Sequence, residues 1–382
     1  MSTDRQHAIY EPAIVRDASF YVERMLSGDG DVQVRPGDRV DPSTELATAL
    51  VAQGRVLQVN VARELEMEPE TVSRYLTKPI GTDFEEGEPV ARARRGLRSV
   101  TCKAPVASTM TDFDESTGVV TLTPISHPQR LYACVHGEVD SVVDHRGVWL
   151  RVGGSRVTGA LGLGQDTFGP LRVAVDRADR EFTADMVDSD FRGSIVLAGM
   201  TLGTSALRRL IEEGVRGVIV GSISDSEIRR YMTTGETEPS SMVIWRQASS
   251  NLQHAQPFSV FVTEGFGRRR MAQPVFQYLA GQENQMASLL IPDQTDVMSA
   301  RPTLYLSRER PGGDEAIQRI NLQDGTLARL VDPEHLGVVV TCRSGVIDSP
   351  HSTGVRRQVV DVEFGNGSRH LVPATSLEVL IQ

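Results

Sequence analysis

Three short apolar runs in the middle of the chain constrain its fold more than any other feature of the sequence. They cover residues 194–198, 215–220 and 258–263, and each is followed by a turn of small residues and then by a helix-like segment. Strands that alternate with helices favour parallel pairing through right-handed crossovers, with the loops gathered at one edge. The sequence therefore predicts a small α/β domain over residues 183–306.

The carboxyl ends of these predicted strands form a candidate binding crevice. In open α/β sheets, ligands bind beyond the carboxyl ends of the strands, where the backbone amides of helix N-termini are free. We expect the crevice to hold a small anionic ligand or a loop of a partner protein. The candidate ligand-binding residues are Gly199, Thr201, Gly221, Ser222, Thr263, Glu264, Gly265, Phe266 and Gly267.

Residues 263–267 give the sharpest of these signals, and they have two interpretations. As a binding site, the glycines let a ligand approach the backbone, Phe266 offers a flat face for stacking, and the arginines at 268–270 attract an anion. As a structural turn, Phe266 packs under the sheet edge, Glu264 caps the next helix, and the arginines form a solvated face. Both interpretations stay open at the level of the sequence.

Length and composition are those of a multidomain globular protein. The 382 residues suggest two or three domains. A net charge of −10, from 40 basic and 50 acidic residues, argues against a general nucleic-acid binder or a membrane-surface protein. The three distant cysteines indicate buried thiols in a reducing compartment. The sequence shows no signal-peptide core and no apolar run near the ~20 residues of a membrane span, so we expect a cytoplasmic protein with no membrane partner.

The N-terminal half is predicted to be rich in β-strands. We expect residues 1–30 to be an N-terminal extension with one short helix, and residues 31–182 to form a β-rich domain with a helical insert at 61–78. The insert has the outline of a helix-turn-helix, but its glutamates oppose docking on DNA. The glycines of 159–169 suggest a phosphate-binding loop. Because a strand rather than a helix follows them, we predict a turn at a barrel corner instead.

Two sequence motifs in this region resemble those of barrel-sandwich hybrid modules. They are Pro-Gly-Asp-Arg-Val at 36–40 and Val-His-Gly-Glu-Val at 135–139. Biotinyl and lipoyl carriers belong to this class, as does the N-terminal module of the membrane electron-transport C subunits. Such carriers present a lysine on an exposed hairpin, whereas the matching turns here carry Asp38, Glu86 or Asp144. The resemblance therefore implies the fold without the swinging-arm function.

The central region also resembles a known class of module. The phrases Gly-Ser-Ile-Val-Leu at 193–197 and Gly-Val-Arg-Gly-Val-Ile-Val at 214–220 are similar to those of swivelling β/β/α modules such as the protease-associated domain. Such modules are usually noncatalytic lids or interaction surfaces. The resemblance thus implies a binding role.

After a polar linker at 307–325, residues 326–382 are predicted to form a β module. Its strands flank a Gly-Asn-Gly hairpin turn at 365–367. The module resembles an SH3-like barrel of the KOW or Tudor type, which often contacts RNA or other proteins. Aromatic side chains for base stacking are nearly absent, so we favour protein interaction over RNA binding. The basic residues of this module are Arg343, Arg356, Arg357 and Arg369.

No residues show the spacing of a catalytic or metal site. The eight histidines are scattered, and the acidic residues at 185, 188 and 190 are typical of an interdomain linker. We therefore expect a noncatalytic scaffold or accessory subunit of mixed α/β and β class, with no cofactor or metal and with a protein partner. One alternative is an enzyme that acts on a phosphate-bearing small molecule with Glu264 as acid or base. The other is an RNA-associated factor that acts through the C-terminal barrel. Together the modules resemble those of bacterial multidomain proteins.

Overall fold

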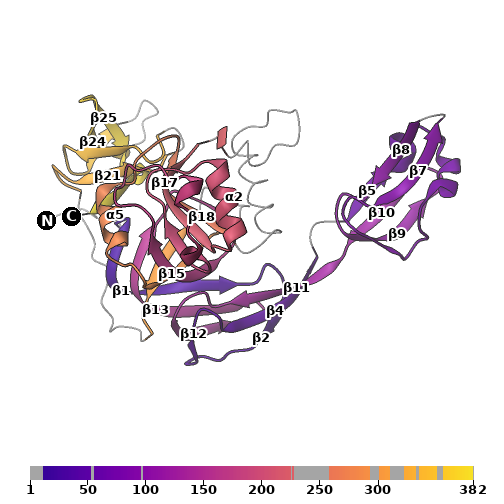
Figure 1. Ribbon diagram of the computed structural model, residues 1–382, viewed down its shortest axis with the longest axis horizontal. Coiled ribbons are helices and arrows are strands. Elements are labelled where there is room, and N and C mark those ends of the chain that lie inside the picture. Colours follow the sequence, from indigo (N-terminus) through magenta and orange to yellow (C-terminus); the bar gives the residue numbers. More distant parts are fainter. Residues whose placement is uncertain are drawn as a thin grey trace.

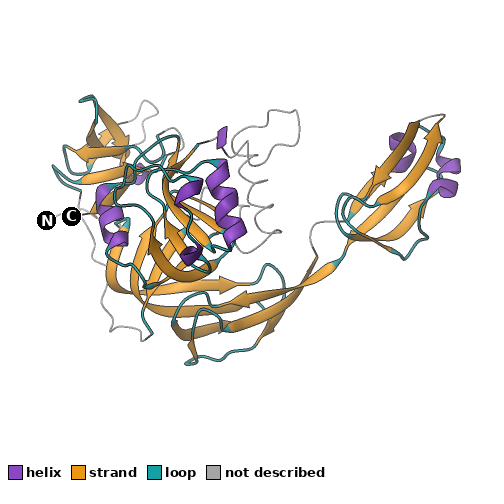
Figure 2. Cartoon of the chain, in the orientation of Figure 1, coloured by secondary structure: helices purple, strands orange, loops and turns teal. Residues whose placement is uncertain are grey.

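The protein is built mostly from β-strands. A computed structural model describes residues 12–52, 56–95, 98–224, 226–227, 258–292, 301–309, 322–332, 335–350 and 356–381. The described strands form curled, half-barrel sheets around separate hydrophobic cores (Figures 1 and 2). No helix within the described residues is long and apolar enough to cross a bilayer.

The largest sheet has eleven strands and joins the N-terminal and central parts of the chain. Its hydrogen-bonded order is β14-β18-β17-β16-β15-β19-β20-β13-β12-β3, and β1 pairs with β13. The strands are β1 (Ile14–Met25), β3 (Arg39–Val40), β12 (Gly137–Val143), β13 (Gly147–Thr158), β14 (Leu161–Gly164), β15 (Thr167–Val173), β16 (Ile195–Leu197), β17 (Gly217–Ile223), β18 (Ser259–Phe266), β19 (Met286–Leu290) and β20 (Thr303–Ser307). Strands β15 to β18 pair in parallel, which confirms the parallel pairing predicted for the three apolar runs.

Helix α2 (Thr204–Glu213) follows β16 and leads into β17, as the alternation of strand and helix predicts. Ala206, Leu207 and Leu210 recur at helical spacing and are buried, which explains why this helix packs with its apolar side inward. The helix ends at Gly214, whose φ of +81° is the left-handed conformation favoured at a helix C-terminus.

Strand β1 occupies residues 14–25, so the short helix predicted within the extension 1–30 does not form there; residues 1–11 lie outside the described part of the chain. Ala18, Phe20 and Val22 are buried and alternate with more exposed side chains, which is the period of a strand. Asp17 interrupts the register in a left-handed conformation, with φ +52°. This alternation is a local signal that could have identified β1, whereas its pairing partner β13 lies more than a hundred residues away.

A second sheet packs across the β1–β13–β12 end of the large sheet. It contains β2 (Gly30–Val32), β4 (Glu45–Ala52) and β11 (Ser126–Tyr132). Their shared core includes Phe20 of β1, Leu46 of β4, Leu131 of β11 and Leu150 of β13. This layered arrangement is compatible with the barrel-like fold predicted for this part of the chain.

Residues 57–124, here called the projecting module, lie at the far end of the paired strands β4 and β11 (Figure 1). Its elements are β5 (Leu57–Asn60), α1 (Val61–Glu64), the 3-10 turn η1 (Pro69–Tyr75), β6 (Asp83–Phe84), β7 (Pro89–Arg95), β8 (Arg98–Lys103), β9 (Ser108–Asp114) and β10 (Val119–Pro124). Leu65, Phe84 and Met110 belong to a hydrophobic core that contains only residues of this module. The predicted helical insert at 61–78 forms α1 and η1, with Pro69 at the start of the second.

The C-terminal strands form a barrel-like sheet of their own, here called the C-terminal barrel (residues 326–381). Its elements are β21 (Leu327–Leu330), β22 (Val339–Cys342), β23 (Ile347–Pro350), β24 (Arg356–Phe364), β25 (Arg369–Pro373), the 3-10 turn η5 (Ala374–Ser376) and β26 (Leu377–Ile381). The predicted turn at 365–367 joins β24 to β25, and Gly367 has φ +81°. The predicted linker at 307–325 lies mostly outside the described residues.

Two local predictions concern the connections. The glycine run at 159–169 forms β14 and the start of β15, two successive strands, as expected for a corner rather than a phosphate loop. The acidic segment before β16 forms the 3-10 turns η2 (Ala184–Met186) and η3 (Ser189–Phe191). There Asp188 accepts a hydrogen bond from the backbone amide of Asp190 at 3.0 Å, so its carboxylate stabilises a turn.

Candidate functional site at the carboxyl edge of the parallel strands

The carboxyl ends of β16, β17 and β18, here called the carboxyl edge, lie side by side. The amide of Gly221 donates to the carbonyl of Gly199 at 2.7 Å, and Ser222 is in register with Gly265. The three glycines predicted to share one rim are therefore neighbours in the structure. Their proximity follows from parallel pairing, which brings equivalent ends of the strands together.

The segment after β18 folds back over this edge. The Oγ of Ser222 accepts a hydrogen bond from the amide of Arg269 at 2.7 Å, and it lies 3.1 Å from the carbonyl of the same residue. Gly221 has no room for a side chain, because a Cβ there would lie 2.6 Å from the backbone nitrogen of Met271. These two predicted site residues thus bind the chain's own backbone.

Glu264 is buried inside the carboxyl edge, with 1% of its surface exposed. Its Oε1 accepts a hydrogen bond from the amide of Ala272 at 2.9 Å, immediately before helix α5 (Gln273–Ala280). Its Oε2 lies 3.5 Å from Nη1 of Arg329, whose side chain is fully buried. Glu264 thus binds the amide of the residue before α5 without capping the helix, and its second partner comes from the C-terminal barrel.

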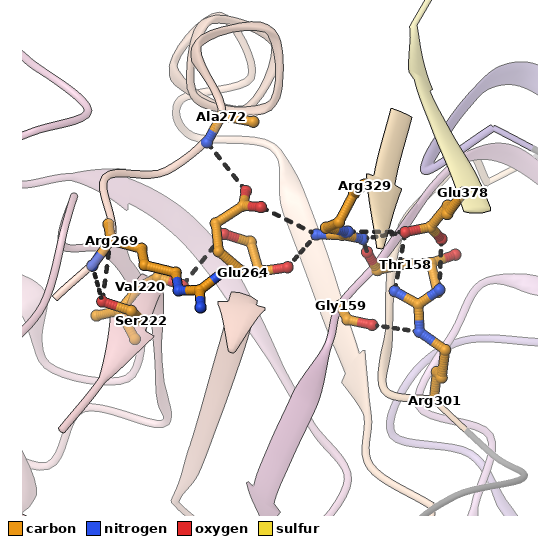
Figure 3. Close-up of polar contacts among 11 residues, drawn as sticks. Thr158, Gly159, Val220, Ser222, Glu264, Arg269, Ala272, Arg301, Arg329 and Glu378 are labelled. Carbon is orange, nitrogen blue, oxygen red and sulfur yellow. Dashed lines mark hydrogen bonds and ion pairs between the residues drawn. The ribbon is translucent and has the colours of Figure 1, made fainter. Parts of the chain in front are cut away.

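Arg329 links Glu264 to a second buried carboxylate, that of Glu378 (Figure 3). Its Nε donates to Oε2 of Glu378 at 2.9 Å, and other nitrogens of the guanidinium donate to the carbonyls of Thr263 and Thr158. Arg301 holds the other side of Glu378, with N–O distances of 2.6 and 3.0 Å. We call these four charged residues, Glu264, Arg329, Glu378 and Arg301, the interdomain network.

Within the interdomain network, burial lowers the pKa of Arg301, whereas opposite charges outweigh burial for Glu378 and Arg329. Burial by itself raises the pKa of Glu378, but Arg329 and Arg301 outweigh this effect and hold that pKa below its ordinary value. Burial likewise opposes the charge on Arg329, yet Glu378 and Glu264 raise its pKa. Glu378 and Arg329 therefore each have an opposite charge beside them that outweighs the effect of burial.

Backbone contacts from the C-terminal barrel complete the cover over the carboxyl edge. A Cβ on Gly265 would lie 3.3 Å from side-chain and backbone atoms of Leu336. Gly337 lies so close to the carbonyl of Glu264 that a Cβ there would overlap it, at 1.3 Å. The carboxyl edge, where ligands bind in many α/β sheets, is the surface on which this chain docks its own barrel.

The remaining predicted residues differ in their surroundings. Thr201 is buried, and its carbonyl accepts a hydrogen bond from the amide of Phe182 at 2.9 Å. Phe266 is partly buried and packs against the core of the large sheet, whereas Gly267 is exposed. Of the arginines predicted to attract an anion, Arg268 forms an ion pair with Glu181 at 2.6 Å.

Sequence reasoning missed Arg301, Arg329 and Glu378. A signal for Arg329 does exist: it follows Ala328 and precedes Leu330, both buried, in an otherwise apolar strand. A charged residue inside such a strand is fully buried only when an opposite charge compensates it. Its partner lies 49 residues away in the sequence, so no local motif identifies it.

Among the described residues, two open surface hollows lie away from the carboxyl edge. One, of about 570 Å³, lies on the projecting module and is lined by residues that include Asn60, Arg63 and Met67. The other, of about 380 Å³, lies near the end of β15 and includes Asp176 and Arg180. Neither is lined by the nine residues predicted from the sequence.

Comparison of the chain with protein-family models and with curated proteins finds no match.

Proposed function

We propose that this chain is a noncatalytic scaffold or accessory subunit that binds a partner protein. One observation supports the proposal above all others: the C-terminal barrel covers the carboxyl edge and engages Glu264 through Arg329. A carboxylate held between a backbone amide and a buried guanidinium is poorly placed to exchange a proton with a substrate. The edge therefore serves to join two parts of one body.

We place the partner site on the projecting module rather than at the carboxyl edge. Strands β4 and β11 hold this module away from the rest of the molecule (Figure 1), so a partner can reach most of its surface. Its own hydrophobic core lets it keep its shape without support from the body. A rigid body with a projecting, self-contained module is an arrangement suited to holding another protein.

The two alternative functions gain less support from the geometry. An enzyme with Glu264 as acid or base requires that the interdomain network open. An RNA-associated factor acting through the C-terminal barrel requires free cations. Arg343 pairs with Glu363 at 2.9 Å and Arg369 pairs with Asp361, which leaves Arg357 exposed without an ion pair among the described residues. Paired surface arginines attract phosphate less strongly, because the neighbouring carboxylate offsets their charge.

The test uses a variant that lacks the projecting module. Ala52 and Ser126 are in register, so an Asn-Gly turn can replace residues 53–125 and close the ribbon. We expect the full chain, purified from its own cells, to carry one protein at fixed stoichiometry, to rebind it when the two are purified separately, and to lose it in the variant. Retention of the partner by a folded variant contradicts the placement on the module. Turnover of a substrate that Glu264→Gln abolishes contradicts the noncatalytic function itself.

A further inference from the structure

The ribbon formed by β7 and β8 carries a concentration of basic residues. The twelve residues from 92 to 103 contain five basic side chains and no acidic one, although the whole chain has a net charge of −10. The two strands pair only with each other, as a two-stranded antiparallel sheet of the projecting module. The local charge is thus opposite in sign to that of the chain as a whole.

The two faces of this ribbon differ sharply in character. Ala91, Ala93 and Cys102 are buried in the core of the module. Arg92 and Arg94 alternate with them and are exposed. Because successive side chains of a strand point to opposite faces, the burial of one set requires that the arginines point outward.

The outward face adds hydroxyl groups to these cations. Thr101 lies opposite Arg92, and Ser99 lies opposite Arg94. Lys103 is also exposed, one step further along β8 and opposite Pro89. Cross-strand neighbours on one face are close enough to contact a single ligand group together.

The exposed cations of the ribbon differ from a neighbouring lysine in their ion pairing. Within the described part of the chain, Arg92, Arg94 and Lys103 form no ion pair, whereas nearby Lys78 pairs with Glu88 at 2.7 Å. The described positions of the ribbon, 89–94 and 99–103, include no carboxylate and no aromatic side chain. The acidic residues of the module lie instead on the α1–η1 segment, on β6 and in the turn at 85–88. Others lie on β9 and in the turn that follows β9.

We propose that the outward face of the β7–β8 ribbon binds the phosphate backbone of a nucleic-acid duplex. Arginine donates paired hydrogen bonds to phosphate, and lysine, serine and threonine are common donors to backbone phosphates. Protein–protein interfaces have cores depleted in charge, whereas nucleic-acid interfaces are polar and strongly positive, as this face is. The lack of aromatic side chains favours phosphate contacts over the stacking of single-stranded bases.

The position of the ribbon supports this assignment independently of the proposed partner protein. The projecting module lies away from the acidic body (Figure 1), so a polyanion can reach the ribbon with less repulsion from the rest of the chain. A two-stranded ribbon also fits the major groove of B-form DNA. Phosphate contacts carry no base preference, so we expect binding without sequence specificity.

The experiment measures binding of the full-length protein to fluorescent 20-base-pair duplexes of DNA and of RNA by anisotropy. If three phosphates are contacted, the affinity for DNA falls about 40-fold between 50 and 200 mM salt. We expect the triple variant R92Q/R94Q/K103Q to bind at least about tenfold more weakly and to lose most of this salt dependence. The matched control R343Q/R369Q removes paired arginines from the C-terminal barrel and is expected to bind like the wild type. The preference between the DNA and RNA arms identifies which duplex provides the phosphates.

Two further measurements serve as controls for the folding of the variant and for the chemistry of the ligand. Thermal unfolding confirms that the triple variant is folded, which we expect because all three side chains are exposed. Vesicles with anionic lipid and polyglutamate serve as competing polyanions. The proposal is overturned if the protein does not bind duplexes, or if the control variant loses as much affinity as the triple variant. It is also overturned if vesicles or polyglutamate bind as tightly as duplexes and this binding depends equally on Arg92 and Arg94.

Discussion

At the scale of single residues, Arg329 is expected to contribute strongly to stability. Its side chain is fully buried between Glu264 and Glu378. Replacing it with methionine preserves much of the volume but leaves Glu264 buried without a counter-ion. Removing one partner of a buried ion pair typically costs about 3–5 kcal/mol. We therefore expect R329M to lower the free energy of unfolding by about that amount in chemical denaturation.

The control for R329M is R369M, which breaks an ion pair with Asp361 at the surface. Exposed pairs contribute about 0–1 kcal/mol, so this variant is expected to be nearly as stable as the wild type. Adding Glu264→Gln to R329M removes the buried charge and is expected to restore part of the loss. If R329M and R369M are equally stable, the interdomain network does not hold the barrel in place.

Glu378 predicts a pH dependence of stability. Its folded pKa is held below the ordinary value of 4.5 by Arg329 and Arg301, although burial opposes this. A lowered folded pKa adds stability that is fully present above the unfolded pKa and is lost as the pH falls through the folded pKa. We expect the stability difference between wild type and E378Q to be largest above about pH 4.5 and to shrink below it. A difference that stays constant from pH 7 to pH 3 would contradict the assignment.

At the scale of elements, the contact between β18 and the loop before β22 decides whether the barrel docks. Gly337 has φ +81°, and a Cβ there would overlap the carbonyl of Glu264. Gly367 has the same φ in the β24–β25 turn, but nothing lies within 4 Å of its missing Cβ. Both alanine variants carry the strain of a left-handed conformation, roughly 1–2 kcal/mol. Only G337A also forces β18 and the barrel apart.

We therefore expect G337A to be less stable than G367A by at least about 1–3 kcal/mol, the usual cost of overpacking. Limited proteolysis then cuts G337A between the central strands and the barrel faster than it cuts G367A. Equal stability and equal cleavage rates would show that the barrel is held by other contacts.

At the scale of the whole molecule, the projecting module and the body have separate cores. No residue of the module core belongs to the core of the large sheet. Separate cores joined by a two-stranded ribbon are expected to unfold as separate units. Calorimetry of the wild type should therefore show more than one transition, and the variant with Asn-Gly in place of residues 53–125 should lose one of them while the others keep their midpoints. A single shared transition, or a shift of every midpoint, would show that module and body are coupled.

Local pattern predicted several elements correctly. The apolar runs at 194–198, 215–220 and 258–263 became parallel strands, because burial on both faces selects continuous apolar segments. The hairpin turn at 365–367 followed from the backbone freedom of glycine. Strand β1 was missed although Ala18, Phe20 and Val22 alternate at the period of a strand; its pairing with β13 lay beyond any local pattern. The boundaries of the projecting module were also missed, since β4 and β11 flank it 73 residues apart.

By itself, the sequence determined the three central strands and their turns and brought Gly199, Gly221 and Gly265 to one edge, because these depend on side-chain period and glycine conformation within a few residues. Only the tertiary structure decided what covers that edge. Glu264 could equally have faced a ligand or a neighbouring domain, and the choice depended on Arg329, a residue whose distance from it in space is unrelated to its distance in sequence. Long-range electrostatic compensation is therefore what separates a binding crevice from a domain junction in this protein.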